Sequence, residues 1–190
     1  MRTAAPSTVT GWREFLSSRG IGCLSSDTLR EAEADRPAEW MLTDAQRDEG
    51  RLGFEPAAEE SLQALERRLG VRLPRTYRSF LATSNGWSSM AGGVNLLAVE
   101  QVDWFTKLTS KLLTIWSEPG MKFFVGNLEA FDRCVLISEM DDRDYFLLDP
   151  GRVGDDGEWA AYEWNEREGV ELDRYASFGA LVTARSASIS

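Results

Sequence analysis

The chain has 190 residues, a net charge of −10 at neutral pH and a composition that is 43% hydrophobic, with seven tryptophans. A chain this apolar is not disordered, and its length suits one folded domain with its own core. It contains no histidine. This removes the commonest general base and the commonest zinc ligand, and so excludes most hydrolase and zinc chemistries.

The two cysteines, Cys23 and Cys134, lie far apart and lack the spacing of metal ligands, so we expect reduced structural thiols. No segment is apolar over the roughly 18 residues that a membrane helix needs, and the N-terminus lacks the apolar core of a signal peptide. We therefore expect a cytoplasmic protein without membrane attachment, metal or cofactor.

Residues 1–50 are polar and loosely patterned, and we expect them to form a helical arm that packs on, or precedes, a domain over residues 51–190. The spacing of three apolar residues predicts a short helix within the arm, at 12–20. The segments 25–34 and 43–50 carry helix-start residues but few apolar anchors. They fit either exposed helical turns or partly ordered linker.

Two helices are predicted next. A leucine stripe, with acids at the start and arginines at the end, indicates a helix over residues 58–69 that stops at Gly70. A second helix is expected to begin at Pro74, because proline is tolerated in a first helical turn. Asn85 and Gly86 are expected to end it, since both tolerate a left-handed backbone.

Beyond this point the apolar period changes to that of strands. The expected elements are strand and turn at 92–105, a short helix at 108–118, strands at 122–127, 133–140 and 144–150, a charged hairpin turn at 139–144, a loop at 149–157, a strand at 158–164 and a helix at 177–185. This order predicts an α+β fold, a single domain with a mixed, mostly antiparallel sheet backed by helices.

Charge is distributed unevenly along the chain. Residues 139–174 contain thirteen acidic residues against four arginines, whereas the rest is close to neutral. The acids there suggest either a Ca²⁺ or Mg²⁺ site or a solvated acidic face. Their spacing does not fit an EF-hand loop, so we favour the solvated face.

Five arginines also cluster in the helical region: Arg67, Arg68, Arg72, Arg75 and Arg78. We favour pairing with the acidic half of the chain, or plain solvation, over nucleic-acid binding for them, because the net charge repels nucleic acid.

The stretch EESLQALERRLGVRLPRTYRSFLATSNGW, followed by VDWF, resembles the SUKH superfamily, which includes a yeast cell-wall synthesis regulator and many bacterial immunity proteins. The pattern combines Glu-x-x-Leu-Gly, an apolar-x-Leu-Pro step, Tyr-x-x-Phe-Leu and Asn-Gly-Trp. Its positions here are Glu66, Leu69, Gly70, Leu73, Pro74, Tyr77, Phe80, Leu81, Asn85, Gly86 and Trp87. The Trp-x-x-Phe-Leu upstream, at Trp12, Phe15 and Leu16, also looks like bacterial members.

The resemblance implies a SUKH-like α+β fold with no catalytic residues, in which the motif positions mainly shape the fold. For bacterial members it implies a non-enzymatic protein that neutralises a cognate secreted toxin, of nuclease or deaminase type, by direct binding. The alternative is a regulatory scaffold that binds a signalling or cell-envelope enzyme. A nuclease offers a basic surface, which an acidic partner can approach rapidly under electrostatic steering.

Contacts to the partner are expected from the acidic loops, with a tryptophan as anchor. The candidate residues are Asp141, Asp142, Asp144, Asp155, Asp156, Glu158, Trp159 and Trp104. Core packing is the alternative role for Trp104 and for Trp87, since buried tryptophans are common.

Overall fold

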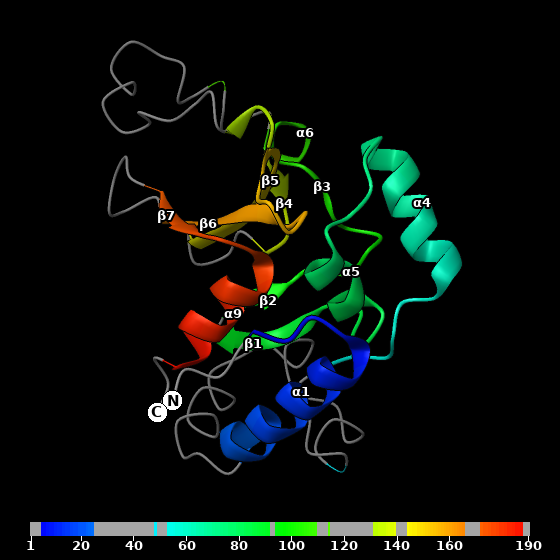
Figure 1. Cartoon of the computed structure of the whole chain (residues 1–190), viewed down its shortest axis with the longest axis vertical. Helices are drawn as coiled ribbons and strands as arrows, with labels where there is room; N and C mark the ends of the chain where they lie inside the picture. Colours follow the sequence, from blue (N-terminus) through cyan, green and yellow to red (C-terminus); the bar gives the residue numbers. More distant parts are fainter. Residues whose placement is uncertain are drawn as a thin grey trace.

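The computed structural model describes residues 5–24, 48, 53–91, 94–109, 114, 131–139, 144–165 and 172–187 (Figure 1). The predicted segments 25–34 and 122–127 lie outside the described residues, as do 43–50 and 108–118 apart from a few positions. The charged turn expected at 139–144 is described only at its two ends.

A five-stranded sheet forms the centre of the described structure. Its strands, in spatial order, are β3 (Asp103–Trp104), β4 (Val135–Leu136), β5 (Asp144–Val153), β6 (Trp159–Asn165) and β7 (Asp173–Tyr175). Each described pairing in this sheet is antiparallel. A second, two-stranded antiparallel sheet joins β1 (Trp87–Ala91) to β2 (Val94–Leu96).

The described helices are α1 (Val9–Leu24), α4 (Glu59–Leu69), α5 (Arg75–Leu81), α6 (Phe105–Leu108) and α9 (Phe178–Ala187). In Figure 1, α4 and α5 lie to the right of the large sheet, α9 and α1 lie below it, and α6 lies at the top. The closing helix α9 contacts β6, β7, β1 and α5, and so lies between the large sheet and the small one. The α+β fold class is confirmed.

Local signals place α4 and the start of α5 where the sequence predicts them. Gly70 follows α4 in the left-handed conformation, with φ of 71°, and its N–H donates to the Glu66 carbonyl. Pro74 directly precedes α5 as its N-terminal cap residue. The predicted end of α5 was wrong, because the helix stops at Leu81. The N–H groups of Thr83 and Ser84 both donate to the Phe80 carbonyl at 2.8 Å, and these bonds end the helix.

Gly86 shapes the entry into β1 rather than the helix end. Its φ is 98°, and a Cβ at this position would lie 2.8 Å from the carbonyl oxygen of Leu96. Both the backbone conformation and the close approach of β2 therefore require glycine here.

Aromatic side chains build the core in two clusters. The first joins the helices to the small sheet and consists of Trp12, Phe15, Tyr77, Phe80, Trp87 and Phe178. The second lies against the large sheet and consists of Phe105, Phe131, Tyr145 and Trp164. Burial of each such ring contributes on the order of 2 kcal/mol. Trp87 thus has the core role, 2% exposed.

The N-terminal helix α1 docks through Trp12, whose side chain is fully buried. The indole N–H donates to the Thr76 carbonyl and to the Ser79 hydroxyl, both at 3.1 Å and both on α5. The predicted helix at 12–20 is confirmed and is longer than expected. The division at residue 50 into an arm and a domain stays a prediction.

Two expectations for the C-terminal half need correction. The segment 149–157 is not wholly loop, because β5 continues through Pro150 to Val153. The strand β7 was missed, since its sequence, Asp-Arg-Tyr, is too short and polar to show a strand pattern. The strands at 144–150 and 158–164 and the helix at 177–185 are confirmed.

Candidate functional site

The β5–β6 hairpin carries most of the described candidate residues. Its strands pair in continuous register from Asp144 opposite Asn165 to Asp149 opposite Ala160. The next pair is Val153 opposite Trp159, so β5 contains three extra residues at this point. Such a bulge increases the local twist and bends the hairpin.

A fully buried carboxylate, Asp149, holds the bulge. Its oxygens accept bonds from Arg133 Nε at 2.9 and 3.0 Å, from the Gly151 N–H at 2.9 Å and from the Tyr162 hydroxyl at 3.3 Å. Arg152 Nε adds a charge at 4.0 Å. The carboxylate raises the pKa of the Arg133 guanidinium, chiefly through the hydrogen bond. Asp149 is therefore a structural acid, fully partnered.

A second buried acid, Glu158, joins the base of the hairpin to α5. Its side chain is only 3% exposed, and Oε1 accepts the Thr76 N–H at 3.1 Å while Oε2 accepts the Thr76 hydroxyl at 2.5 Å. Arg75 Nε lies 3.8 Å from Oε1. These bonds satisfy a backbone donor at the first turn of α5, which has no partner within the helix.

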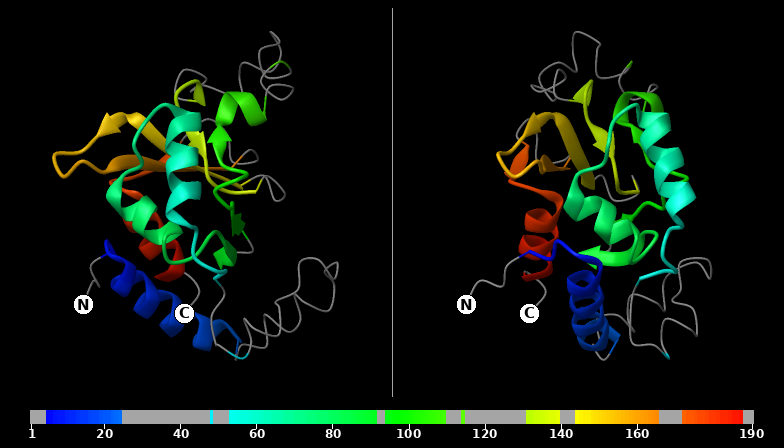
Figure 2. Two further views of the ribbon diagram at one scale, coloured as in Figure 1. Left: turned by 90° about the vertical axis from the view of Figure 1, so that its right-hand side faces the viewer. Right: turned by 45° about the vertical axis from the view of Figure 1, so that its right-hand side comes forward.

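The tip of the hairpin has the opposite character. Residues 151–157 are all exposed, and this tip extends away from the rest of the molecule (Figure 2, left). Val153 is 56% exposed. Asp155 and Asp156 follow it, and Asp156 Oδ1 accepts the Glu158 N–H at 3.1 Å, which fixes the turn. The tip therefore presents an apolar side chain beside two carboxylates.

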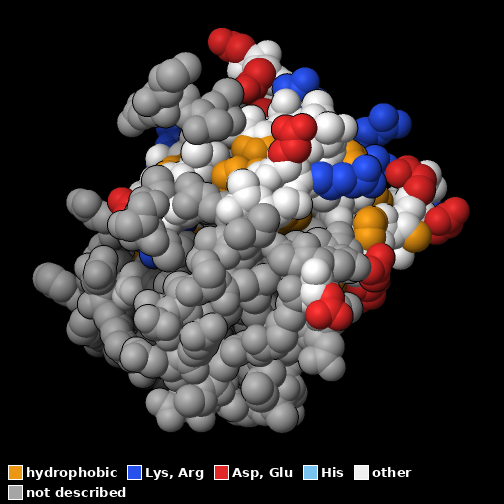
Figure 3. Space-filling model, turned by 90° about the horizontal axis from the view of Figure 1, so that it is seen from below, with side chains coloured by type: hydrophobic (Ala, Val, Ile, Leu, Met, Phe, Trp, Pro, Cys, Tyr) orange, Lys and Arg blue, Asp and Glu red, His pale blue; other side chains and the backbone are white. Residues whose placement is uncertain are grey.

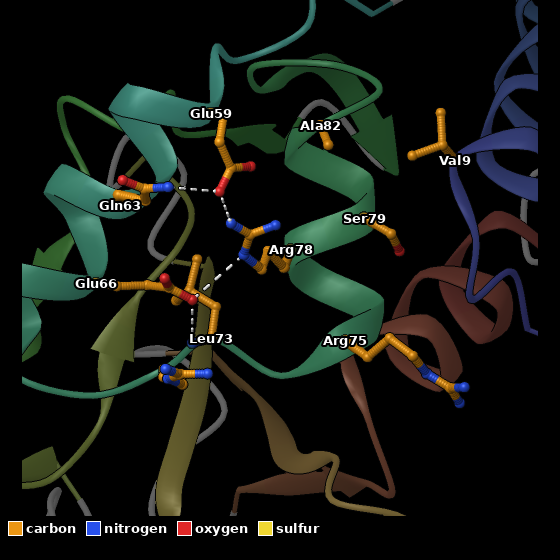
Figure 4. Close-up of a pocket in the computed structure, with 10 residues that line it drawn as sticks. Val9, Glu59, Gln63, Glu66, Leu73, Arg75, Arg78, Ser79 and Ala82 are labelled. Atoms are coloured by element: carbon orange, nitrogen blue, oxygen red, sulfur yellow. Dashed lines mark hydrogen bonds and ion pairs between the residues drawn. The ribbon is translucent and has the colours of Figure 1, made fainter.

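A hollow of about 630 Å³ lies beside α5, on another part of the surface. The side chains that line it come from α4, α5, the loop between these helices and the start of α1 (Figure 4). An adjoining hollow of about 410 Å³ runs along α4 and shares Gln63, Glu66 and Arg72 with the first. We call the two together the α4–α5 groove.

An ion-pair cluster lies inside the α4–α5 groove. Arg78 points toward Glu59 and Glu66, at 2.5 and 3.3 Å (Figure 4). The hydrogen bond from Gln63, followed by that from Arg78, lowers the pKa of the Glu59 carboxyl. Glu66 also accepts the Leu73 N–H at 3.1 Å. These bonds brace the loop between α4 and α5.

Charges at the surface near α4 are mixed rather than of one sign. Seen from below, acidic and basic side chains lie side by side at the right-hand edge, where α4 lies (Figure 3). Arg68, on the opposite side of α4 from the groove cluster, donates to the Val99 and Val102 carbonyls at 2.5 and 2.7 Å. Three of the five clustered arginines, Arg68, Arg75 and Arg78, thus have different partners.

The eleven motif positions have mainly structural surroundings. Asn85 is one example: its side-chain oxygen accepts the Val99 N–H at 2.8 Å, and its amide donates to Glu100. Glu66 braces a loop, Gly70 and Pro74 bound helices, and Gly86 admits a neighbouring strand. The others are buried: Leu69, Leu73, Tyr77, Phe80, Leu81 and Trp87.

The structure corrects two of the predicted partner contacts. Glu158 is 2% exposed and Trp159 is 5% exposed, so neither side chain is presented at the surface. Because β6 is buried on both faces, the alternation of side chains along the strand does not bring Trp159 to the surface, and Glu158 directly precedes this strand.

The remaining predicted contacts are divided among different places. Asp155 and Asp156 lie together at the tip, and Asp144 begins β5 at the other end of that strand. Asp141 and Asp142 lie outside the described residues. Trp104 is half-buried against the core, where it ends β3 and directly precedes α6.

Sequence reasoning missed the structural acids and the α4–α5 groove. Asp149 was counted among the surface acids, although a carboxylate just after an apolar strand and just before Pro-Gly is a signal for a bulge. The bond between Glu158 and Thr76 joins residues 82 positions apart, and no local pattern reveals it.

Metal-binding clusters and reactive thiols are two features that catalysis often uses. Among them, no three cysteine, histidine or carboxylate side chains gather as metal ligands would. Burial raises the pKa of the Cys134 thiol to about 12, so this thiol is a poor nucleophile. Within the described segments, no helix has the length and apolarity that crossing a bilayer requires. The exposed tip and the groove are suited to binding.

The comparisons with known proteins agree with the fold. The family model described as the SMI1 / KNR4 family (SUKH-1) matches residues 56–184. This span runs from just before α4 into α9 and includes the hairpin and the groove-lining residues other than Val9. A comparison with curated proteins found no match. Because the matched span covers more than half of its length, the chain belongs to the SMI1/KNR4 family (SUKH-1).

Proposed function

We propose that this protein is a non-enzymatic immunity protein, which binds a cognate secreted toxin of nuclease or deaminase type and so neutralises it. Membership of the SUKH family supports protein binding and is consistent with an immunity role. The observation that carries the proposal is the projecting β5–β6 tip, where Val153, Asp155 and Asp156 are exposed together.

The chemistry of the tip suits a basic partner surface. Two exposed carboxylates at a projecting turn can enter a basic cleft, and Val153 supplies apolar contact area beside them. Arg152 is half exposed at the same tip and offsets part of this charge, because the Asp149 carboxylate 4.0 Å from its Nε already pairs with Arg133. The net charge of −10 increases the association rate with a cationic protein.

The same proposal includes where the protein acts and what it does not bind. We place it in the cytoplasm, where the toxin would be met before secretion, and we expect no binding to nucleic acid or to a membrane surface. Steering of this kind weakens with added salt, mainly through the association rate.

Co-expression with the toxin encoded beside the gene tests the proposal. We expect cells that express both proteins to survive, and the purified pair to form a complex that lacks toxin activity. If the toxin still kills, or if the two proteins do not associate, the immunity function is wrong. A regulatory scaffold for a signalling or envelope enzyme then becomes the better hypothesis.

Charge reversal separates the tip from the rest of the acidic surface. Asp155→Lys should lower the association rate by about tenfold at low salt. The control is Asp173→Lys, which should change the rate little. Asp173 is an exposed acid on β7, opposite Glu163 and therefore near the end of β6 that is farther from the tip. Val153→Ser should raise the dissociation rate instead, because apolar contact area is lost. Equal effects of the two charge reversals would show that the toxin does not bind at the tip.

A further inference from the structure

The α4–α5 groove carries unbalanced positive charge on an otherwise acidic protein. Inside it, Arg78 is offset by Glu59 and Glu66. Arg67 and Arg72 also line the groove, are exposed, and form no ion pair among the described residues. At the other end of the groove, the Arg75 side chain is 68% exposed, with Glu158 at 3.8 Å.

The groove also has apolar and hydrogen-bonding surface. Val9, Leu73 and Ala82 line it together with Gln63 and Ser79. Val9 belongs to the start of α1 and stands across α5 from α4 (Figure 4). The groove is therefore walled by α4 on one side and by the start of α1 on the other, with α5 as its floor.

We propose that the α4–α5 groove binds an extended acidic segment of a partner protein. Carboxylates of the segment pair with the exposed guanidinium groups of Arg67 and Arg72, which bind carboxylate with two parallel hydrogen bonds. Aliphatic side chains of the segment contact Leu73 and Ala82. This surface is distinct from the β5–β6 tip, and the proposal does not depend on the toxin.

The shape of the groove favours an extended chain over a small molecule. The two hollows adjoin along α4, and both are shallow surface depressions rather than enclosed cavities. Small ligands bind in pockets that bury most of their surface. An extended peptide needs only a row of shallow contacts.

The groove's own acids favour a peptide over nucleic acid. Glu59 and Glu66 lie beside the arginines, and a phosphate backbone would meet these carboxylates at every few residues. The net charge of −10 opposes nucleic acid further. A peptide with spaced carboxylates and apolar residues between them carries fewer negative charges per unit length, so both penalties are smaller for it.

Titration with synthetic peptides tests the proposal on the full chain. The probe is a labelled peptide of alternating acidic and aliphatic residues, and its control has lysine at each acidic position. We expect saturable binding of the acidic peptide by fluorescence anisotropy, with amide shifts in α4 and α5 by NMR. No saturable binding, or equal binding of the lysine peptide, would overturn the proposal.

Matched variants locate the site. The double variant Arg67→Glu, Arg72→Glu should weaken acidic-peptide binding by at least about tenfold. Arg174→Glu should leave it within about twofold, because Arg174 is an exposed arginine on β7, across the molecule from α4 (Figure 1). Unchanged melting temperatures show that both variants fold. Equal loss in both, or tighter binding of single-stranded RNA than of the acidic peptide, would contradict the assignment.

Discussion

The tip and the base of the β5–β6 hairpin differ sharply in the exposure of their acidic side chains, although they are only a few residues apart. At the tip, Asp155 and Asp156 are exposed, whereas at the base Glu158 is 2% exposed and bonded to α5. Asp149, on the other strand of the base, is fully buried. An acidic stretch therefore contains two kinds of carboxylate, and only those at the tip are available to a partner.

A third buried acid extends this comparison along β6. Glu163 is 9% exposed and accepts bonds from Arg185 at 3.2 Å and the Tyr175 hydroxyl at 3.1 Å. Burial, and then the nearby Glu163 carboxylate, raises the pKa of Tyr175 to about 12. Some of the acidic charge in residues 139–174 thus stabilises the sheet, and the sequence count overstates the charge that a partner meets.

The largest expected effect is on the alkylation rate of the Cys134 thiol, which lies beside the hairpin base. Cys134 is fully buried and its pKa is about 12, chiefly because of burial and next because of Asp149. In a Cys23→Ser variant, alkylation of Cys134 at pH 8 should be slower than that of an exposed thiol by roughly three orders of magnitude. Mass spectrometry over time measures the rate, and 8 M urea (about the usual unfolding concentration) should restore it. Rapid labelling without urea would show that the base is open to solvent.

Asp149→Ala should cause the largest loss of stability. It leaves Arg133 without its buried partner and the Gly151 N–H without its acceptor, which should cost about 3 kcal/mol of unfolding free energy. Urea unfolding followed by tryptophan fluorescence gives the value. The control is Asp132→Ala, an exposed acid beside Arg133, which should change stability by less than about 0.5 kcal/mol. Similar values for the two variants would refute the structural role of Asp149.

Glu158→Ala should cost about 2 kcal/mol, because the Thr76 N–H and hydroxyl lose a buried acceptor. Glu158→Gln should cost less, since its amide oxygen still accepts one bond. A double-mutant cycle with Thr76→Val tests the pairing directly, with an expected coupling of about 1 kcal/mol. Additive effects of the two substitutions would mean that the hairpin base and α5 are not joined through this contact.

The elements that sequence predicts well are those fixed by nearest neighbours. Gly70 and Pro74 bound α4 and α5 because backbone φ and a missing N–H act locally, whatever the rest of the fold. The apolar stripes of α4 and α5 and the strand pattern of β6 are equally local. These features were enough to place the helices, the main hairpin and the fold class.

The features that sequence missed depend on distant partners. Glu158 looked like its neighbours Asp155 and Asp156 because its acceptor role is set by Thr76, 82 positions away. Pro150 and Gly151 looked like a loop because the bulge they form is held by contacts from Arg133 to Asp149. The α4–α5 groove likewise exists only once α1, α4 and α5 are brought together.

The tip gives the smallest expected change in stability and the clearest contrast with the base. Asp155→Asn is the same carboxylate-to-amide substitution as Glu158→Gln, but Asp155 is exposed, so the unfolding free energy should change by less than about 0.5 kcal/mol. Asp156→Asn should behave similarly, because its amide oxygen still accepts the Glu158 N–H. Urea unfolding measures both. A loss as large as that of Glu158→Gln would mean that the tip acids hold the fold, and it would remove the reason for assigning them to a partner.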